Sequence, residues 1–331
     1  MTPPPGPHPL PLPFQEIADQ VYCIETGLYR HGLAACYLVR SADRLAFVDT
    51  GTARAVPGLL QVIAALGLGP EHVDYVIPTH VHLDHAGGAG DLMQACPQAG
   101  LIIHPRGAPH MIDPTRLIAG ATAVYGADAF ARDYGGLTPV AETRIELAWD
   151  GMGIDLAGRT LTFFDTPGHA NHHGCLFDSA TRGCFTGDTF GISYREFDGP
   201  AGPWLFAPTT PVAFDPEAWL QTLDKLMGLT PRSMYLTHYG RLDRPEDLVG
   251  DLRQSIRDMA EVALQEEGRD DPDRAARLKA AVADRLMAAA RAHGVDLDAG
   301  RMAELLALDT ELNAQGLEVW LKRRERQTGG G

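Results

Sequence analysis

Residues 79–88 read Thr-His-Val-His-Leu-Asp-His-Ala-Gly-Gly, and this stretch decides how the rest of the chain is interpreted. Three histidines and one aspartate fall within six positions. Imidazole and carboxylate groups are ligands that suit zinc, iron and manganese. Alternate residues of an extended segment point to the same side, so His80 and His82 can bind one metal ion. Asp84 and His85 follow at a predicted turn into a helix and can face a second ion.

The segments around this stretch alternate between strand and helix patterns. Short apolar runs with β-branched and aromatic residues indicate strands, and apolar residues at helical spacing indicate helices. Strand, helix and strand in succession are typical of a βαβ unit in a parallel sheet. We predict strands at residues 21–25, 34–40, 45–48, 73–77 and 101–104, and helices over 53–66 and 87–95.

Further side chains of the metal-binding type follow other predicted strands. In the second half of the chain, predicted strands are followed by His169, Asp188 and His238. Asp49 directly follows the strand that ends at residue 48. Polar residues at the ends of apolar strands lie at the edge of a sheet, where α/β folds usually place their sites. The chain therefore delivers metal-type side chains from four separate strand ends, with Asp49 as a fifth polar position.

Composition limits the classes of partner. The 331 residues are 45% hydrophobic and carry a formal net charge of -15, which indicates a globular protein without the basic surface that nucleic acid or an anionic membrane requires. The five cysteines form no CxxC pair, and the first residues lack the basic start and apolar core of a secretory signal. We expect reduced thiols, a cytoplasmic protein, no membrane span and a small-molecule substrate.

The chain divides by composition. We predict a disordered proline-rich arm over residues 1–14, an α/β body over 15–245, an all-helical extension over 246–327 and a frayed tail at 328–331. The extension could pack on the body, shape a pocket or mediate a homodimer. About four helices are expected in it, with breaks near residues 268–273, 294 and 316.

Taken together, the motifs resemble the metallo-β-lactamase superfamily. They are His-x-His-x-Asp-His at residues 80–85, Thr-Pro-Gly-His at 166–169, Gly-Asp-Thr at 187–189 and Thr-His-Tyr-Gly at 237–240. With Asp49 they stand in the order of the family and cover the α/β body. The resemblance implies a four-layer αββα sandwich, in which two mixed sheets pack face to face between helices and the metals lie at one edge. Here a C-terminal helical extension would follow it.

The resemblance also implies two divalent metal ions, with zinc favoured and iron or manganese as alternatives. Asp188 would bridge the two ions, and Asp49 would brace the metal loops by hydrogen bonds. Asp84 would in addition orient the attacking hydroxide or move a proton. The remaining ligands would divide into His80, His82 and His169 at the first ion and Asp84, His85 and His238 at the second.

A dinuclear site of this kind implies a hydrolase in which a metal-bridging hydroxide attacks a small ester, thioester or lactone. Residues 166–173 and 236–240 resemble a group of prokaryotic hydrolases related to glyoxalase II, whose substrates are largely unassigned. No cysteine stands at a ligand position, which disfavours the zinc β-lactamases that use one. A histidine at position 82 instead of glutamate disfavours the flavodiiron branch.

Three alternatives stay open. The first is a mononuclear iron persulfide dioxygenase of the same fold, which would use two histidines and the aspartate at position 188. The second is a nuclease, which the net charge of -15 disfavours. The third is a binding protein with a vestigial site, which the complete ligand set disfavours. Metal analysis combined with a substrate panel would separate them.

Candidates for the substrate pocket come from two loops. Tyr29 and His31 lie on the loop of the first hairpin, where a plain loop role is an equal alternative. The long loop over 190–211 contributes three aromatic residues, for which packing beneath the loop is the favoured alternative. Tyr239 follows a ligand directly and could donate to an oxyanion. The loop aromatics are Tyr194, Trp204 and Phe206, and two further histidines, His172 and His173, are assigned to packing or to bracing of the ligands.

Overall fold

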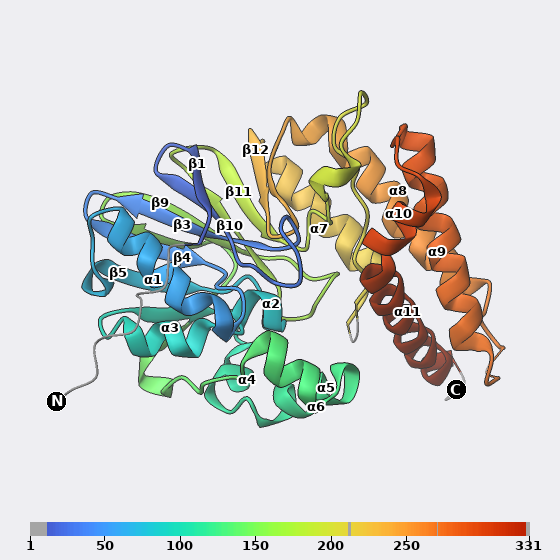
Figure 1. Ribbon diagram of the computed structural model, residues 1–331, viewed down its shortest axis with the longest axis horizontal. Coiled ribbons are helices and arrows are strands. Elements are labelled where there is room, and N and C mark those ends of the chain that lie inside the picture. The colour runs from blue at the N-terminus through green and yellow to red at the C-terminus, as the bar shows by residue number, and fades with distance from the viewer. Residues whose placement is uncertain (1–11, 211–212, 270, 329–331) are drawn as a thin grey trace. The chain divides into compact units, whose positions relative to one another are not determined.

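The computed structural model describes residues 12–210, 213–269 and 271–328 (Figure 1). These residues include two β-sheets, one of seven strands and one of six. The order of the first sheet is β1-β2-β3-β4-β5-β6-β7, and its strands are β1 (Phe14–Ala18), β2 (Val21–Glu25), β3 (Ala35–Ser41), β4 (Arg44–Val48), β5 (Val73–Ile77), β6 (Gly100–Ile103) and β7 (Ile145–Leu147).

The second sheet has the order β13-β12-β11-β10-β9-β8. Its strands are β8 (Met152–Leu156), β9 (Arg159–Asp165), β10 (Gly174–Asp178), β11 (Gly183–Gly187), β12 (Ser233–Leu236) and β13 (Gly240–Asp243). Both sheets mix parallel and antiparallel pairs: β4 and β5 are parallel, as are β11 and β12, whereas β2 pairs with β3 and β12 with β13 in antiparallel fashion. The two mixed sheets with helices expected from the sequence are confirmed.

The chain forms two compact units, which we call unit 1 and unit 2. Unit 1 comprises Met1–Phe164 and Leu176–Thr181, and unit 2 comprises Asp165–Cys175 and Arg182–Gly331. The metal-type residues divide between them, with residues 80–85 in unit 1 and the three later ones in unit 2. The division of the chain at residue 245, drawn from composition, stays a prediction.

In unit 1, the register of two parallel strands places the predicted site residues. Val48 at the end of β4 pairs with Ile77 at the end of β5, so both strands end at the same level. The backbone N–H of Asp49 still donates to the carbonyl of Ile77, at 3.2 Å. Asp49 and the His-rich stretch therefore leave the sheet side by side. Both strands are largely buried and apolar, as parallel strands require.

Helices in unit 1 follow the predicted pattern with one interruption. The helix predicted over 53–66 is a short 3₁₀ turn followed by α1 (Val56–Ala65). The helix predicted over 87–95 is observed as α3 (Ala89–Ala95), and a short helix that was not predicted, α2 (Leu83–Ala86), precedes it. Gly88 lies between them, where a Cβ atom would come within 2.9 Å of the Thr52 carbonyl oxygen. The absence of a side chain thus lets this junction approach the loop that follows β4.

Four short helical segments in unit 1 occupy the irregular region predicted after residue 105. The second and fourth of them contribute Ala121, Phe130 and Tyr134 to a small cluster of buried residues that also includes Leu83 of α2. The segments are α4 (Ala108–Ile112), α5 (Thr115–Tyr125), α6 (Ala127–Ala129) and a π-helical turn (Phe130–Tyr134).

In unit 2, helix α7 (Pro216–Gly228) is tied to the loop that carries Asp188. The Asp215 carboxylate caps the helix by accepting a 3.0 Å hydrogen bond from the N–H of Ala218. Trp219 is fully buried, and its Nε1–H donates to the carbonyl of Thr189 at 2.7 Å. A buried indole needs such an acceptor, so this bond fixes both the helix and the loop.

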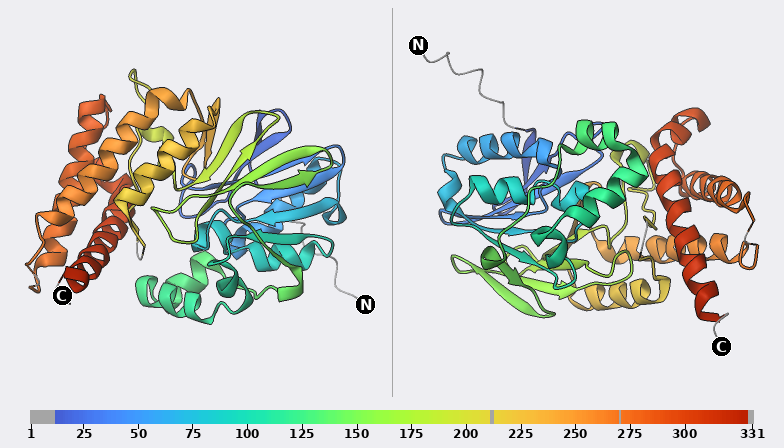
Figure 2. Two further views of the ribbon diagram at one scale, coloured as in Figure 1. Left: turned by 180° about the vertical axis from the view of Figure 1, so that it is seen from behind. Right: turned by 90° about the horizontal axis from the view of Figure 1, so that it is seen from below.

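The C-terminal extension consists of four helices, as predicted. They are α8 (Pro245–Leu264), α9 (Arg274–His293), α10 (Ala299–Leu305) and α11 (Ala307–Thr328), and α9 packs against both α8 and α11 (Figures 1 and 2). The breaks near residues 268–273 and 294 are confirmed. The break expected near Gly316 is wrong, because α11 continues through it and the chain bends at Leu306 instead. Gly316 has a packing role: its bare backbone makes room for the carbonyl of Thr209.

Three short edge or near-edge strands escaped prediction. β1 begins at Phe14, inside the predicted arm, whose first eleven residues lie outside the described part of the chain. β7 ends the first sheet, and β13 ends the second beyond the strand predicted to be last. β1 and β7 hold only exposed and half-buried residues, and β13 alternates buried and exposed residues over four positions, so each apolar pattern is too weak or too short to recognise.

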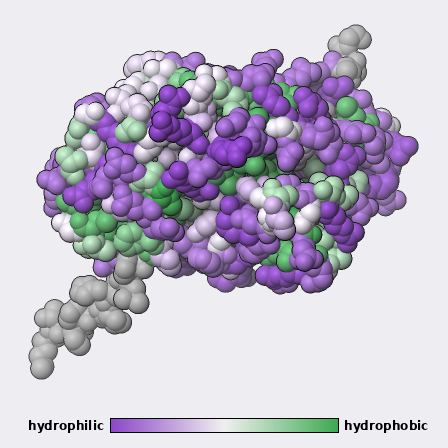
Figure 3. All heavy atoms as spheres, turned by 90° about the horizontal axis from the view of Figure 1, so that it is seen from above, coloured by the Kyte–Doolittle hydropathy of each residue, from purple (hydrophilic) through white to green (hydrophobic). Residues whose placement is uncertain are grey.

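The surface agrees with the composition. On the face drawn in Figure 3, hydrophilic residues cover most of the coloured area, and hydrophobic residues form small patches between them. Among the described residues, no helix combines the length and the apolar character needed to cross a membrane.

Substitution of Gly316 by alanine tests the contact between α11 and the loop. At an exposed position inside a helix, alanine stabilises the helix by about 1 kcal/mol relative to glycine. At Gly316 the added methyl group would overlap the Thr209 carbonyl, so we expect a loss of about 1–3 kcal/mol from overpacking. The matched control is Gly250→Ala in α8, where a methyl group meets no atom within 4 Å and should stabilise. Urea unfolding measures the free energy of unfolding of both variants. If both substitutions stabilised the protein, the close contact at Gly316 would be contradicted.

Candidate metal centre

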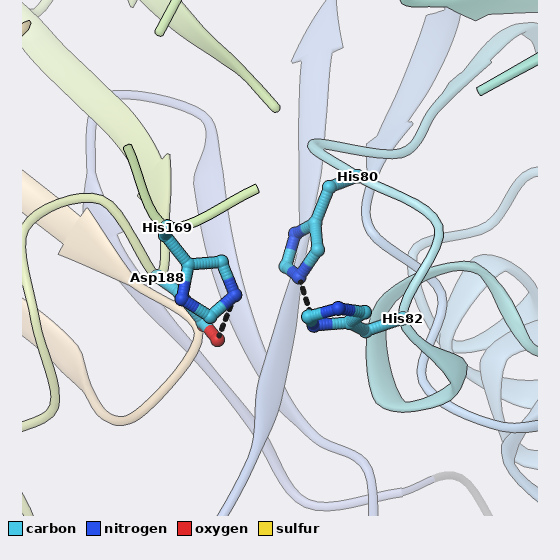
Figure 4. Close-up of side chains that lie close together, drawn as sticks. All are labelled: His80, His82, His169 and Asp188. Atoms are coloured by element: carbon cyan, nitrogen blue, oxygen red, sulfur yellow. Dashed lines mark hydrogen bonds and ion pairs between the residues drawn. The ribbon is translucent and has the colours of Figure 1, made fainter. Parts of the chain in front are cut away.

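The first group of metal-type side chains lies in unit 1, in the loop after β5. His80 is fully buried, and its Nε2 lies 2.8 Å from Nδ1 of His82 (Figure 4). The two rings come from alternate residues and meet edge to face, with their centroids 4.4 Å apart. Two imidazole nitrogens at this separation share a proton or accept a common cation.

Asp49 holds the second half of this group. Its buried carboxylate accepts hydrogen bonds from the N–H of Thr79 at 2.7 Å and from Nδ1 of His85 at 2.8 Å. A carboxylate can only accept a hydrogen bond, so Nδ1 of His85 carries the proton. Nε2 is then the unprotonated nitrogen, which could bind a metal ion. That Nε2 lies 3.7 Å from the carboxylate of Asp84. These are the contacts on which the predicted bracing role of Asp49 depends.

The second group lies in unit 2 and is centred on Asp188. One oxygen of this carboxylate is 3.3 Å from Nε2 of His169 (Figure 4), and the other is 3.5 Å from Nε2 of His238. His169 donates from Nδ1 to the carbonyl of Pro208 at 2.8 Å, so its Nε2 is the nitrogen turned toward Asp188. Each oxygen of Asp188 thus faces a different histidine, as a bridging carboxylate would.

His173 supports Asp188 from behind. Its Nδ1 lies 2.9 Å from the hydroxyl of Thr166 and 3.1 Å from that of Thr189. Its Nε2 accepts from the backbone N–H of Asp188 at 3.3 Å. Both ring nitrogens therefore have partners inside unit 2, and the side chain is placed to brace the ligand loop.

The two groups fit divalent metal ions by donor chemistry. In His85 and His169 the proton on Nδ1 is fixed by an acceptor, which leaves the lone pair of Nε2 facing a carboxylate. A lone pair and a carboxylate repel each other unless a cation or a proton lies between them. Histidine ligands of metal ions typically show this arrangement, with the second nitrogen bonded to a carboxylate or a carbonyl. The two groups of histidine and aspartate side chains are consistent with a dinuclear metal site.

Comparison with known families decides the assignment. Residues 29–238 match the model of the family described as the metallo-beta-lactamase superfamily. The chain belongs to the metallo-beta-lactamase superfamily. The matched segment includes every metal-type residue of both groups, so the family resemblance stated from the motifs is confirmed at this level. The glyoxalase II-related branch is a finer assignment and is treated below as a proposal.

Three relatives illustrate the breadth of this superfamily. The metallo-beta-lactamase fold-containing protein ST1585 of Sulfurisphaera tokodaii is 25% identical over 229 residues, which cover 68% of this chain and 79% of that protein. Its crystal structure has a TM-score of 0.62 and covers 90% of this chain and 98% of its own, which shows the shared fold. The human acyl-coenzyme A thioesterase MBLAC2 is 27% identical over 209 residues, or 58% of this chain and 68% of that protein.

The third relative is a flavoprotein by name. The type A flavoprotein fprA of Rhodobacter capsulatus is 27% identical over 175 residues, which cover 52% of this chain and 35% of the flavoprotein. The chain thus spans about a third of that protein. The relatives thus include proteins named as a thioesterase and as a flavoprotein.

Near Asp84, unit 1 gathers three tyrosines. Tyr29, predicted as a pocket residue, is 47% exposed, and its hydroxyl lies 3.0 Å from that of Tyr134. The Tyr134 ring contacts that of Tyr125, with centroids 5.2 Å apart. Burial, and after it the charge of Asp84, raises the pKa of Tyr125 to about 12. Burial also raises the pKa of Tyr134, so both phenols stay protonated donors at neutral pH. Tyr125 and Tyr134 lie in the irregular helical region and belong to no motif, so neither was predicted as a pocket residue.

The other pocket candidates occupy different surroundings. His31 is 80% exposed and its Nδ1 lies 3.1 Å from the carboxylate of Glu25. Tyr239 is half-buried beside His238, which is a predicted ligand. The three aromatic residues of the long loop are buried and contact one another, with the Trp204 and Phe206 centroids 5.0 Å apart. Their assignment to a substrate pocket stays a prediction, with packing as the arrangement that the structure displays.

Replacement of Asp49 by asparagine tests whether the hydrogen bond from Nδ1 of His85 to the Asp49 carboxylate strengthens metal binding. An amide offers one acceptor oxygen for two donors and turns an N–H toward Thr79 or His85. Loss of such an outer partner typically weakens metal binding 10–100-fold, and we expect an effect of about this size. Competition with a chromogenic chelator measures it. The control is Asp43→Asn, whose carboxylate is 77% exposed and pairs only with Arg40 among the bonds described. Equal affinities in the two variants would contradict the role of Asp49.

Proposed function

We propose that this protein is a hydrolase that uses two divalent metal ions, most simply zinc, to cleave a small ester, thioester or lactone. The observation that carries the proposal is the environment of Asp188, whose two carboxylate oxygens face the Nε2 atoms of His169 and His238. Membership of the metallo-beta-lactamase superfamily supports the same reading. In the loop after β5, His80, His82, Asp84 and His85 would supply the remaining ligands.

Bound metal ions would supply Lewis acidity and an activated water at neutral pH. The residues of this chain would do the rest. Asp84 is the most exposed carboxylate of the ligand set, with a quarter of its side chain accessible, and it would accept the proton of the attacking water. The water oxygen forms a bond to the carbonyl carbon, and the bond from that carbon to sulfur or oxygen then breaks. The leaving group takes up the proton, which gives a carboxylic acid and a thiol or alcohol.

A thioester is the substrate class that we favour within this proposal. A relative with 27% identity is named as an acyl-coenzyme A thioesterase, and most of that protein is covered by the match. A thiolate is a good leaving group, so cleavage of a thioester demands less from a general acid than cleavage of an alkyl ester. Tyr29 would contact the substrate, since it is half-exposed and lies with Tyr134 in the surroundings of Asp84. The glyoxalase II-related branch that the motifs favour belongs to the same proposal.

The proposal is tested by metal analysis of the purified protein together with a panel of acyl-coenzyme A thioesters, glutathione thioesters, aryl esters and lactones. We expect two metal ions per chain and turnover of at least one thioester. His82→Ala and Asp188→Ala should lose metal and activity by more than the roughly 100-fold associated with loss of an outer hydrogen-bond partner. His72→Gln, a turn histidine in neither group, is the control.

Two outcomes would reject the proposal. Retention of both metal ions and full turnover by Asp188→Ala would show that this carboxylate is not a bridging ligand. One iron per chain, with oxygen uptake on a persulfide and no hydrolysis, would favour the mononuclear dioxygenase. In that case the His238→Ala variant would keep its activity, because a single ion would not need the second set of ligands.

A further inference from the structure

The C-terminal helix α11 is joined to the metal ligand His169 by a continuous set of buried hydrogen bonds within unit 2. The link runs through residues 207–209 of the long loop. His169 donates from Nδ1 to the carbonyl of Pro208 at 2.8 Å, and the residues on either side of Pro208 are bonded to α11. Nothing in the family motifs includes this helix.

Asn313 of α11 makes the decisive contacts. Its Oδ1 accepts from the backbone N–H of Thr209 at 2.8 Å, and its Nδ2 donates to the carbonyl of Ala207 at 3.2 Å. The hydroxyl of Thr209 donates in turn to the backbone carbonyl of Asn313 at 3.2 Å. The three residues are almost completely buried, so water cannot replace these bonds. The side-chain amide therefore clamps the main chain on both sides of Pro208 and sets the direction of its carbonyl.

The same face of α11 is shaped to receive the loop. Asp309, Asn313 and Gly316 are spaced at i, i+4 and i+7 and so lie on one side of the helix. Asp309 accepts from the hydroxyl of Tyr194 at 3.0 Å, which fixes the start of the loop. Gly316 leaves room for the carbonyl of Thr209. From α8, the hydroxyl of Ser255 accepts from the N–H of Ala207 at 2.9 Å, so the segment is held from two helices.

We propose that Asn313 is a positioning residue of the metal centre, which fixes the Pro208 carbonyl and through it the tautomer and direction of the His169 ring. The consequence is that Nε2 of His169 is held as an unprotonated ligand toward Asp188. This inference rests on the proposed metal-dependent function. It assigns a role to the helical extension, which is to hold the ring of His169 in position although the extension itself contains none of the family motifs.

The test compares Asn313→Ala with the wild-type full-length protein by two measurements. In metal-free protein labelled with ¹⁵N-histidine, long-range ¹H–¹⁵N spectra at pH 8 report the tautomer of His169. We expect the Nδ1–H form in the wild type and a mixture in the variant. Competition for zinc against a chromogenic chelator should show a dissociation constant raised about tenfold, at the lower end of the effect of outer partners.

The control is Arg274→Met. Arg274 is buried between Glu318 and Glu325 of α11 and does not bond to residues 207–209, so the variant should lose stability but keep the tautomer and the zinc affinity. If Asn313→Ala does not fold, Thr209→Val carries the same test, because it preserves shape and removes one bond of the clamp. For it we expect a change of about threefold in zinc affinity.

The outcomes separate this inference from the function on which it rests. An unchanged tautomer and zinc affinity in Asn313→Ala, or an equal change in Arg274→Met, would overturn the positioning role and leave the hydrolase proposal intact. Absence of zinc binding by the wild type would overturn the hydrolase proposal, and the tautomer spectra would still decide whether Asn313 orients His169.

Discussion

A histidine that binds a metal through one ring nitrogen has a second ring nitrogen, which carries a proton. The geometry of the proposed site depends on the acceptor to which this second nitrogen donates its hydrogen bond. A buried N–H without an acceptor costs about 1–3 kcal/mol, so each ligand histidine needs an acceptor placed behind it. For His85 this is the carboxylate of Asp49, and for His169 it is the carbonyl of Pro208. Both acceptors are buried and fixed by the main chain around them. The loops that carry the proposed ligands can therefore be positioned before a metal binds, which would reduce the entropy lost on binding.

The sheets explain how such loops reach one place within each unit. In unit 1 the parallel strands β4 and β5 end in register, so Asp49 and Thr79 are brought within one hydrogen bond of each other. In unit 2 the parallel strands β11 and β12 end before Asp188 and His238, whose side chains lie 3.5 Å apart. Parallel pairing is what places residues from distant parts of the sequence at the same edge. The placement of the proposed ligands within each unit thus depends on strand register as well as on the motifs themselves.

Much of this arrangement could be predicted from local patterns, and what escaped prediction depends on distant contacts. Strand ends and ligand motifs are visible because apolar runs stop and histidine or aspartate follows. The edge strands β7 and β13 are too short to show a period. Gly316 was interpreted as a helix break because glycine is usually unfavourable inside a helix, yet here it admits a loop from 107 residues earlier in the chain, Thr209. Tyr134 and Asn313 belong to no motif. Their partners are distant in the sequence and are brought to them only by packing, so local patterns could not predict their roles.

The helical extension is physically part of the unit that carries His169, Asp188 and His238. Composition changes near residue 245, but the hydrogen bonds do not stop there. Ser255 and Asn313 hold the loop that orients His169, and Arg323 bonds to the carbonyl of Phe214 just before α7. Removal of α8–α11 would leave buried loop donors and acceptors without partners, at a cost comparable to several lost hydrogen bonds. A change of composition along a chain therefore marks a change of secondary structure, whereas the ligand geometry is maintained by bonds that cross it.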